Sequence, residues 1–154
     1  MPTIGKTAPA FTLPATGDQN IRLSTLKGQN VVVYFYPRDA TPGCTTESQN
    51  FRDAQKQFAN ANTVILGISQ DPIKNHEKFK VKQKLNFELL SDESGDICRK
   101  YEVLKMKKMY GKQFEGIERS TFLIDANGKL QMEWRQVKVP GHVDEVLAAA
   151  QALS

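Results

Sequence analysis

Two nearly continuous apolar runs stand out along the chain, at residues 31–36 and 63–69. Apolar runs of this length without alternation are typical of strands that are buried on both faces of a sheet. Between the two runs, apolar side chains recur at the spacing of one helix face. This pattern predicts a helix over residues 42–60, and the same spacing near the chain end predicts a last helix whose buried face is formed by Val143, Val146, Leu147 and Ala150.

Shorter patterns predict the elements on either side of the second strand. Residues 11–13 and 21–23 flank a turn-rich segment, which predicts an N-terminal β-hairpin. Asp71 and Pro72 predict the start of a second helix that ends near Lys84, because Asp is a common helix cap and Pro is favoured in the first turn. We therefore expect Asp71 to cap this helix.

The second half of the chain completes the pattern. Residues 87–90 read as a short strand, and a short helix is expected over residues 92–101. Asn127 and Gly128 form a strong turn signal, which predicts a hairpin of two strands over residues 120–125 and 130–135. Strands that alternate with helices imply parallel pairing. The expected fold is α/β, one domain over residues 1–154, with a central mixed sheet and helices on both faces.

Composition and charge narrow the class of protein. Of 154 residues, 40% are hydrophobic and 25% charged, an ordinary globular balance, and no apolar run approaches the ~20 residues of a membrane span. The start of the chain shows no apolar signal region. The net charge is only +4, and the lysine clusters at residues 74–84 and 105–112 are interpreted as a solvated helix face and a solvated loop. We expect neither a membrane nor a nucleic-acid partner.

The chain contains two cysteines, Cys44 and Cys98, and two histidines, His76 and His142. Two cysteines are too few for a secreted disulfide scaffold, and none of these residues has the close spacing of a structural zinc site. The expectation is a cytoplasmic protein without metal or cofactor. In that setting a thiol is either a buried filler or a reactive group.

Cys44 has the sequence context of a reactive thiol. The predicted strand at residues 31–36 leads through a loop into a helix that Thr41 can cap and Pro42 can start, so that Cys44 falls in the first turn. Ligands of open α/β sheets bind at the carboxyl ends of strands. The unpaired N–H groups and the dipole at a helix start favour negative charge, which lowers the pKa of a cysteine placed there. A thiolate at this position is a nucleophile at neutral pH.

The segments around Cys44 resemble a known family. The string PRDATPGC matches the peroxiredoxin pattern P-x-x-x-T-x-x-C at Pro37, Thr41 and Cys44, and residues 34–47 are similar to the peroxiredoxin Q subgroup, also called bacterioferritin comigratory protein. Residues 110–125 and the start of the chain resemble the same subgroup. The resemblance implies a thioredoxin-like fold and thiol-dependent reduction of hydrogen peroxide and organic hydroperoxides.

By position, the resemblance makes Cys44 the peroxidatic cysteine, which attacks the peroxide and becomes a sulfenic acid. Thr41 would offer its hydroxyl to the peroxide, Pro37 would cover the thiol from water, and Arg119 would be the guanidinium near the sulfur. Each of these residues also has a structural interpretation: Thr41 as a helix cap, Pro37 as a strand stop and Arg119 as a surface residue at a strand end. Glu47 is expected either to pair with Arg119 or to be solvated.

The resemblance leaves the recycling step open. Many members carry a resolving cysteine where this chain has Gln49, and others carry it in the following helix, which here has none. Cys98 is the remaining thiol, and we predict that it forms an intramolecular disulfide with Cys44. The alternatives are a one-cysteine peroxidase recycled by an external thiol and a redox sensor or holdase. The expected partners are a hydroperoxide and a thioredoxin- or glutaredoxin-type reductant, and the resemblance suggests a monomer.

Overall fold

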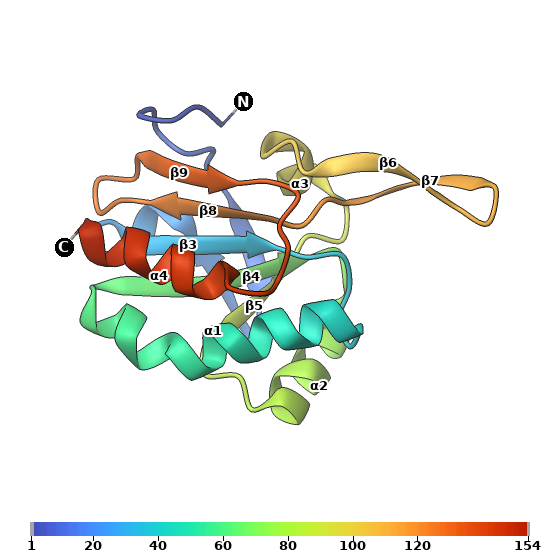
Figure 1. Ribbon diagram of the computed structural model, residues 1–154, viewed down its shortest axis with the longest axis horizontal. Coiled ribbons are helices and arrows are strands. Elements are labelled where there is room, and N and C mark those ends of the chain that lie inside the picture. Colours follow the sequence, from blue (N-terminus) through green and yellow to red (C-terminus); the bar gives the residue numbers. More distant parts are fainter. Residues whose placement is uncertain (1, 154) are drawn as a thin grey trace.

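A seven-stranded mixed sheet forms the centre of the computed structural model, which describes residues 2–153 (Figure 1). In spatial order its strands are β2 (Gln19–Arg22), β1 (Thr12–Ala15), β5 (Glu88–Ser91), β4 (Thr63–Ser69), β3 (Asn30–Phe35), β8 (Ser120–Ile124) and β9 (Leu130–Trp134). The three central strands β3, β4 and β5 are parallel, whereas β1, β2, β8 and β9 pair in antiparallel fashion. The predicted mixed sheet with a closing antiparallel hairpin is confirmed.

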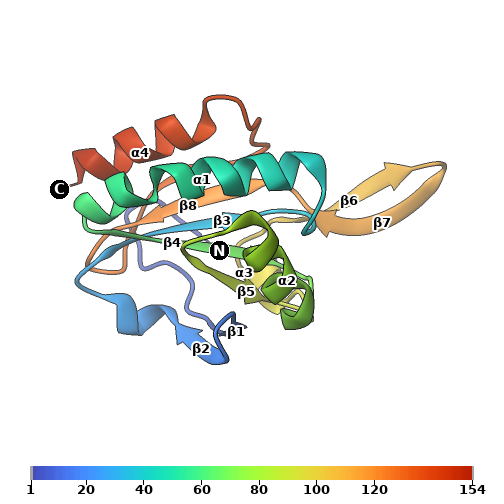
Figure 2. The same ribbon diagram turned by 90° about the horizontal axis from the view of Figure 1, so that it is seen from below.

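Helices cover both faces of this sheet, as predicted. They are α1 (Pro42–Asn60), α2 (Ile73–Gln83), α3 (Asp96–Lys100) and α4 (His142–Ala152), with a 3₁₀ turn η1 (Leu23–Leu26) after the N-terminal hairpin. Figure 2 shows α1 and α4 side by side on one face. Successive side chains of a strand point to opposite faces of the sheet, so the side chains of β3 are divided between two cores. Val32, Tyr34 and Tyr36 pack with α1, α2 and α4.

The other face of β3 contributes to a second core. Val31, Val33 and Phe35 pack with the N-terminal segment, with α3 and with the residues that follow α3. Both cores are built largely from fully buried aliphatic and aromatic side chains, and burial of such groups is the main source of folding stability. The two faces are therefore separate apolar environments. No helix among residues 2–153 is long and apolar enough to cross a membrane.

Several predicted elements need correction. The expected helix over residues 92–101 is shortened to the five residues of α3. The helix α2 begins after Pro72 and has no side-chain cap, so the prediction that Asp71 caps it is wrong. The carboxylate of Asp71 instead accepts hydrogen bonds from the Asp39 N–H and from the Ser69 hydroxyl. Long-range partners therefore override the local capping preference.

The lysine-rich segment after α3 is a hairpin rather than the expected loop. It forms β6 (Leu104–Met109) and β7 (Lys112–Ile117), which pair in antiparallel register and project from the body of the molecule (Figure 1). Tyr110 and Gly111 form its turn, both with positive φ, at 54° and 76°. Most of its side chains are exposed on both faces, so the segment lacks the apolar alternation that would have revealed two strands.

Candidate active site

Cys44 lies at the carboxyl end of the central strand β3. The chain leaves β3 after Phe35, turns through a short loop and enters α1 at Pro42, whose ring suits the first helical position. This places Cys44 in the first turn of α1, as predicted. Its side chain is only 1% exposed and packs in the core on the α1 face of the sheet.

Arg119 reaches Cys44 because of the register between β3 and β8. Phe35, the last residue of β3, pairs with Ser120, the first residue of β8. Arg119 therefore stands beside the point where the chain turns toward Cys44. Its Nη2 lies 3.4 Å from Cys44 Sγ, and its Nη1 donates to Glu47 Oε1 at 2.7 Å.

Gly43 makes room for this guanidinium. A Cβ built at position 43 would lie 3.1 Å from Arg119 Nη2, closer than most such contacts. A glycine immediately before the cysteine therefore lets the cation approach the sulfur. The structural interpretation of Arg119 as a surface residue does not hold, because its side chain is only 15% exposed and its two terminal nitrogens are both engaged.

Glu47 is fully buried one helical turn after Cys44. Burial raises its pKa to about 7, although the adjacent Arg119 guanidinium acts in the opposite direction. Burial lowers the pKa of Arg119, but Glu47 and Cys44 raise it more, so that the guanidinium stays charged. Among the described residues, Glu47 Oε2 has no hydrogen-bond partner. Of the two interpretations of Glu47, pairing with Arg119 is confirmed.

Thr41 occupies the N-cap position of α1, but its side chain does not cap the helix. Its hydroxyl donates instead to the carbonyl oxygen of Arg38 at 2.9 Å. Pro37 is exposed, and it lines a cleft of about 530 Å³ together with Thr41. The opposite wall of the cleft is the β6–β7 hairpin, through residues that include Lys107, Met109 and Phe114. The cleft therefore leads to the loop that precedes Cys44.

Lys107 is a part of this region that the sequence analysis missed. Its Nζ donates to the Ile117 carbonyl oxygen, and its stem packs close to Gly116. Burial lowers the pKa of Lys107, the nearby Arg119 lowers it further, and Cys44 and Glu118 oppose the change. Two cationic residues, Lys107 and Arg38, thus line the cleft. The Gly111 turn signal between two six-residue segments is the feature that could have revealed the hairpin.

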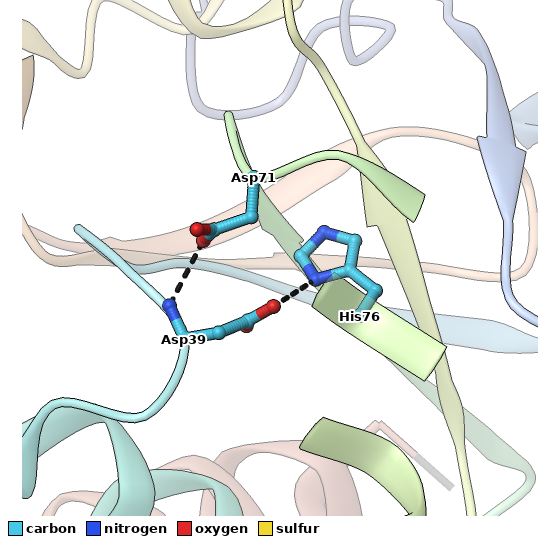
Figure 3. A group of neighbouring side chains, drawn as sticks. All are labelled: Asp39, Asp71 and His76. Atoms are coloured by element: carbon cyan, nitrogen blue, oxygen red, sulfur yellow. Dashed lines mark hydrogen bonds and ion pairs between the residues drawn. The ribbon is translucent and has the colours of Figure 1, made fainter. Parts of the chain in front are cut away.

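A polar cluster lies behind the loop and is formed by the buried Asp39 and His76 and the half-buried Asp71 (Figure 3). Their potential ligand atoms lie within 4.8 Å of one another, which raises the question of a metal. Both His76 nitrogens already face acceptors, Asp39 Oδ2 at 2.6 Å and the Leu90 carbonyl at 2.9 Å. The hydrogen-bonding capacity of the ring is therefore already used within the protein at both nitrogens. The donor set therefore does not favour metal binding.

Cys98 is not brought to this site. It lies in α3, is 0% exposed and packs in the core on the opposite face of the sheet from Cys44. Burial and the neighbouring Asp92 carboxylate raise the pKa of its thiol far above the ordinary value. A disulfide needs Cα atoms within about 4.4–6.8 Å. The predicted Cys44–Cys98 disulfide stays a prediction, and it requires α3 to unwind.

Comparison with known sequences identifies relatives along nearly the whole chain. The model of the AhpC/TSA family matches residues 4–133. The chain is 47% identical to peroxiredoxin Bcp of Bacillus subtilis, over 98% of this chain and 96% of that protein. It is 41% identical to peroxiredoxin Bcp of Escherichia coli, over 93% of this chain and 92% of that protein.

Solved structures give the same picture. A structure of bacterioferritin comigratory protein from Xanthomonas campestris, studied for alkyl peroxide reduction, matches with a TM-score of 0.88 at 46% identity, over 92% of this chain and 90% of that one. A cysteine-to-serine mutant of PrxQ from Xylella fastidiosa matches with a TM-score of 0.93 at 41% identity, over 99% of this chain and 97% of that one.

Proposed function

This chain belongs to the AhpC/TSA family and is a thiol-dependent peroxidase of the peroxiredoxin type, and on this basis we propose how its residues share the reaction. Cys44 is the peroxidatic nucleophile, Arg119 stabilises the charge that develops, and Thr41 orients the peroxide. The observation that carries the proposal is the 3.4 Å contact between Arg119 Nη2 and Cys44 Sγ at a helix start.

The first half-reaction consumes the peroxide. The Cys44 thiolate attacks one peroxide oxygen, an S–O bond forms as the O–O bond breaks, and the sulfur becomes a sulfenic acid. The leaving oxygen departs as water or an alcohol after it gains a proton. Negative charge moves from sulfur toward the leaving oxygen, so fixed cationic donors along this path lower the barrier. Arg119 is permanently charged and is held in place by buried Glu47.

Thr41 has the orientation that an acceptor needs. Its hydrogen is directed at the Arg38 carbonyl, so the oxygen lone pairs are available to a peroxide O–H. An accepted hydrogen bond would fix the direction from which the O–O bond meets the sulfur. Pro37 lines the same cleft with a ring that carries no backbone N–H, and we assign it the shielding of this wall from water.

For the second half-reaction we propose direct reduction by an external thiol. One thiol displaces water from the sulfenic acid and forms a mixed disulfide with Cys44, and a second thiol releases the Cys44 thiol and leaves as the disulfide product. The burial of Cys98 on the opposite face of the sheet supports this order. Resolution by Cys98 is the competing route, because local unwinding of the five-residue α3 would expose its thiol.

The proposal also covers the reductant, the substrates, the oligomeric state and the cellular compartment. The reductant is a thioredoxin- or glutaredoxin-type thiol, the substrates include organic hydroperoxides as well as hydrogen peroxide, and the enzyme acts as a monomer in a reducing cytoplasm. Two free cysteines and bacterial relatives support this setting. Light scattering at assay concentration tests the monomer, and a protein that scatters as a dimer would contradict it.

Intact-mass spectrometry after one equivalent of peroxide tests the chemistry directly. Direct reduction predicts a gain of one oxygen on Cys44, with Cys98 still open to alkylation after denaturation. A loss of two hydrogens with a linked Cys44–Cys98 peptide would establish the competing route instead. Turnover with dithiothreitol separates an enzyme from a sensor, because a sensor reacts once per chain and stops.

A further inference from the structure

One peptide unit connects Thr41 to the polar cluster behind the loop. The Arg38 carbonyl oxygen accepts from Thr41 Oγ1 at 2.9 Å, and the Asp39 N–H donates to Asp71 Oδ2 at 2.9 Å. This C=O and this N–H belong to the same peptide bond, which is planar. A rotation of the peptide plane therefore changes both contacts together, and a group that fixes the N–H also fixes the acceptor of the Thr41 hydroxyl.

Asp71 is a rigid anchor for that N–H. It lies two residues after Ser69, the last residue of β4, and Figure 3 shows its carboxylate directed at the Asp39 nitrogen. The same Oδ2 accepts from the Ser69 hydroxyl, and the Asp71 N–H lies 3.2 Å from Ser69 Oγ. The Ser91 hydroxyl, at the end of the neighbouring strand β5, donates to the Asp71 carbonyl at 2.6 Å. The ends of two strands thus hold Asp71 in place, Ser69 through its carboxylate and Ser91 through its backbone carbonyl.

The side chain of Asp39 provides a second anchor. Its Oδ1 accepts from the Tyr36 hydroxyl at 2.6 Å, and its Oδ2 is hydrogen-bonded to His76 Nδ1 at 2.6 Å. The Leu90 carbonyl can only accept, so His76 Nε2 carries a proton. His76 presents its other ring nitrogen, Nδ1, to the Asp39 carboxylate (Figure 3). His76 and Asp39 are 0% and 7% exposed, and charge-assisted bonds of this kind are the strong ones.

The loop needs such anchors because of its backbone. Ala40, between Asp39 and Thr41, has a φ of +64°, a conformation that residues with a Cβ adopt rarely. Thr41 itself stands at the N-cap position, where a threonine oxygen normally accepts an N–H of the first helical turn. Released from Arg38, the hydroxyl would be free to cap α1, and its oxygen would no longer be available to a peroxide.

We propose that Asp71, supported by the Asp39–His76 pair, is a positioning residue for peroxide reduction that acts through the Arg38–Asp39 peptide on the hydroxyl of Thr41. Asp71 lines the cleft near Thr41, but the role assigned to it runs through the Arg38–Asp39 peptide and not through contact with the peroxide. The inference rests on the proposed role of Thr41 as the acceptor of the peroxide O–H. It gives a function to the aspartate that precedes α2 without capping it.

The first test is the rate of Cys44 oxidation, measured by stopped-flow with limiting peroxide. Asp71→Ala should slow oxidation about tenfold, because a group that positions the reacting atoms is released. Asp71→Asn keeps an acceptor oxygen for the Asp39 N–H and should recover most of the rate. Asp125→Ala is the matched control: Asp125 accepts backbone N–H groups in the distant β8–β9 turn, and its loss should leave oxidation unchanged. Equal rates for Asp71→Ala and wild type would overturn the proposal.

A double-mutant cycle with Thr41→Val distinguishes positioning from a general structural role. If Asp71 acts through the Thr41 hydroxyl, Asp71→Ala should cost nothing further in the Thr41→Val background. Additive losses would overturn the proposal and leave the proposed role of Thr41 intact. A normal oxidation rate in Thr41→Val alone would refute that role, and the relay with it. If Asp71→Ala proves unfolded by circular dichroism, Asp39→Asn replaces it in the same cycle.

Discussion

Cys44 and Cys98 occupy opposite faces of the same sheet and share several properties. Both lie near the beginning of a helix, and both are almost completely buried, at 1% and 0% exposure. Their charged neighbours differ: Cys44 faces the guanidinium of Arg119 at 3.4 Å, whereas the Cys98 backbone N–H donates to the carboxylate of Asp92 at 2.8 Å. A thiolate is stabilised by a cation and opposed by an anion. Burial and helix position alone therefore do not identify a reactive cysteine.

The two regions also differ in how the chain outside the helix is arranged. Thr41 and Pro37, in the loop before Cys44, line a cleft that could admit a small reactant. Cys98 follows a short turn over residues 92–95 and packs against the N-terminal segment in the core on the other face of the sheet. Access and charge thus favour the same cysteine.

The largest expected effect is the loss of turnover in Cys44→Ser. Serine cannot supply a thiolate, so peroxide consumption with dithiothreitol as reductant should fall to background. Cys98→Ser is the matched control, and it should keep near-wild-type turnover if an external thiol reduces Cys44 directly. A folded Cys98→Ser variant that stops after one turnover would show that Cys98 takes part in recycling.

Arg119→Ala should give the next largest effect. Loss of one donor that stabilises developing charge typically costs about 10²–10³ in rate, or roughly 2.7–4 kcal/mol. Stopped-flow oxidation of Cys44 measures this cost. Arg135→Ala removes a guanidinium elsewhere, one that donates to the Tyr101 and Glu102 carbonyls, and should not affect the oxidation rate. An unchanged rate in Arg119→Ala would remove Arg119 from the proposed mechanism.

The buried carboxyl group of Glu47 should make the free energy of unfolding depend on pH. Its pKa is raised from 4.5 to about 7 in the folded protein, so between these values the folded state binds more protons than the unfolded state. The free energy of unfolding should therefore decrease as pH rises from about 4.5 to about 7, by on the order of 3 kcal/mol from this residue.

The measurement is the difference between wild type and Glu47→Gln in urea unfolding across this pH range. The difference is needed because burial lowers the pKa of His142 to about 4, which gives a contribution of opposite sign over part of the range. His142 is present in both proteins, so its contribution cancels. A difference that does not change with pH would contradict the raised pKa of Glu47.

The parts of the molecule that the sequence predicted are those with a local periodic signal. The bounds of α1 and β4 agree with the prediction, because a helical face and a continuous apolar run mark them. The contact between Arg119 and Cys44 was expected only from the family resemblance. In physical terms it depends on the pairing of Phe35 with Ser120, far apart in the chain, which no local pattern encodes.

The predictions that the structure corrects failed for the same reason, because local patterns do not encode contacts between distant residues. Asp71 and Pro72 form a good local start signal, but the long-range contact with the Asp39 N–H determines where the carboxylate points. The β6–β7 hairpin lacks a buried face, so its strands carry no alternation to detect. Partners distant in sequence decide the orientation of polar side chains, and the site depends on such partners throughout.

The smallest effect is expected for Cys98→Ala. The substitution removes one sulfur from a packed core and should lower the free energy of unfolding by about 1 kcal/mol, because the surrounding side chains close only part of the space. Urea unfolding measures this change, and peroxide turnover should be unaffected if Cys98 acts only as a buried apolar group. A stable Cys98→Ala variant that accumulates over-oxidised Cys44 under turnover would break the contrast between the two cysteines, because it would show that Cys98 protects the sulfenic acid by reacting with it.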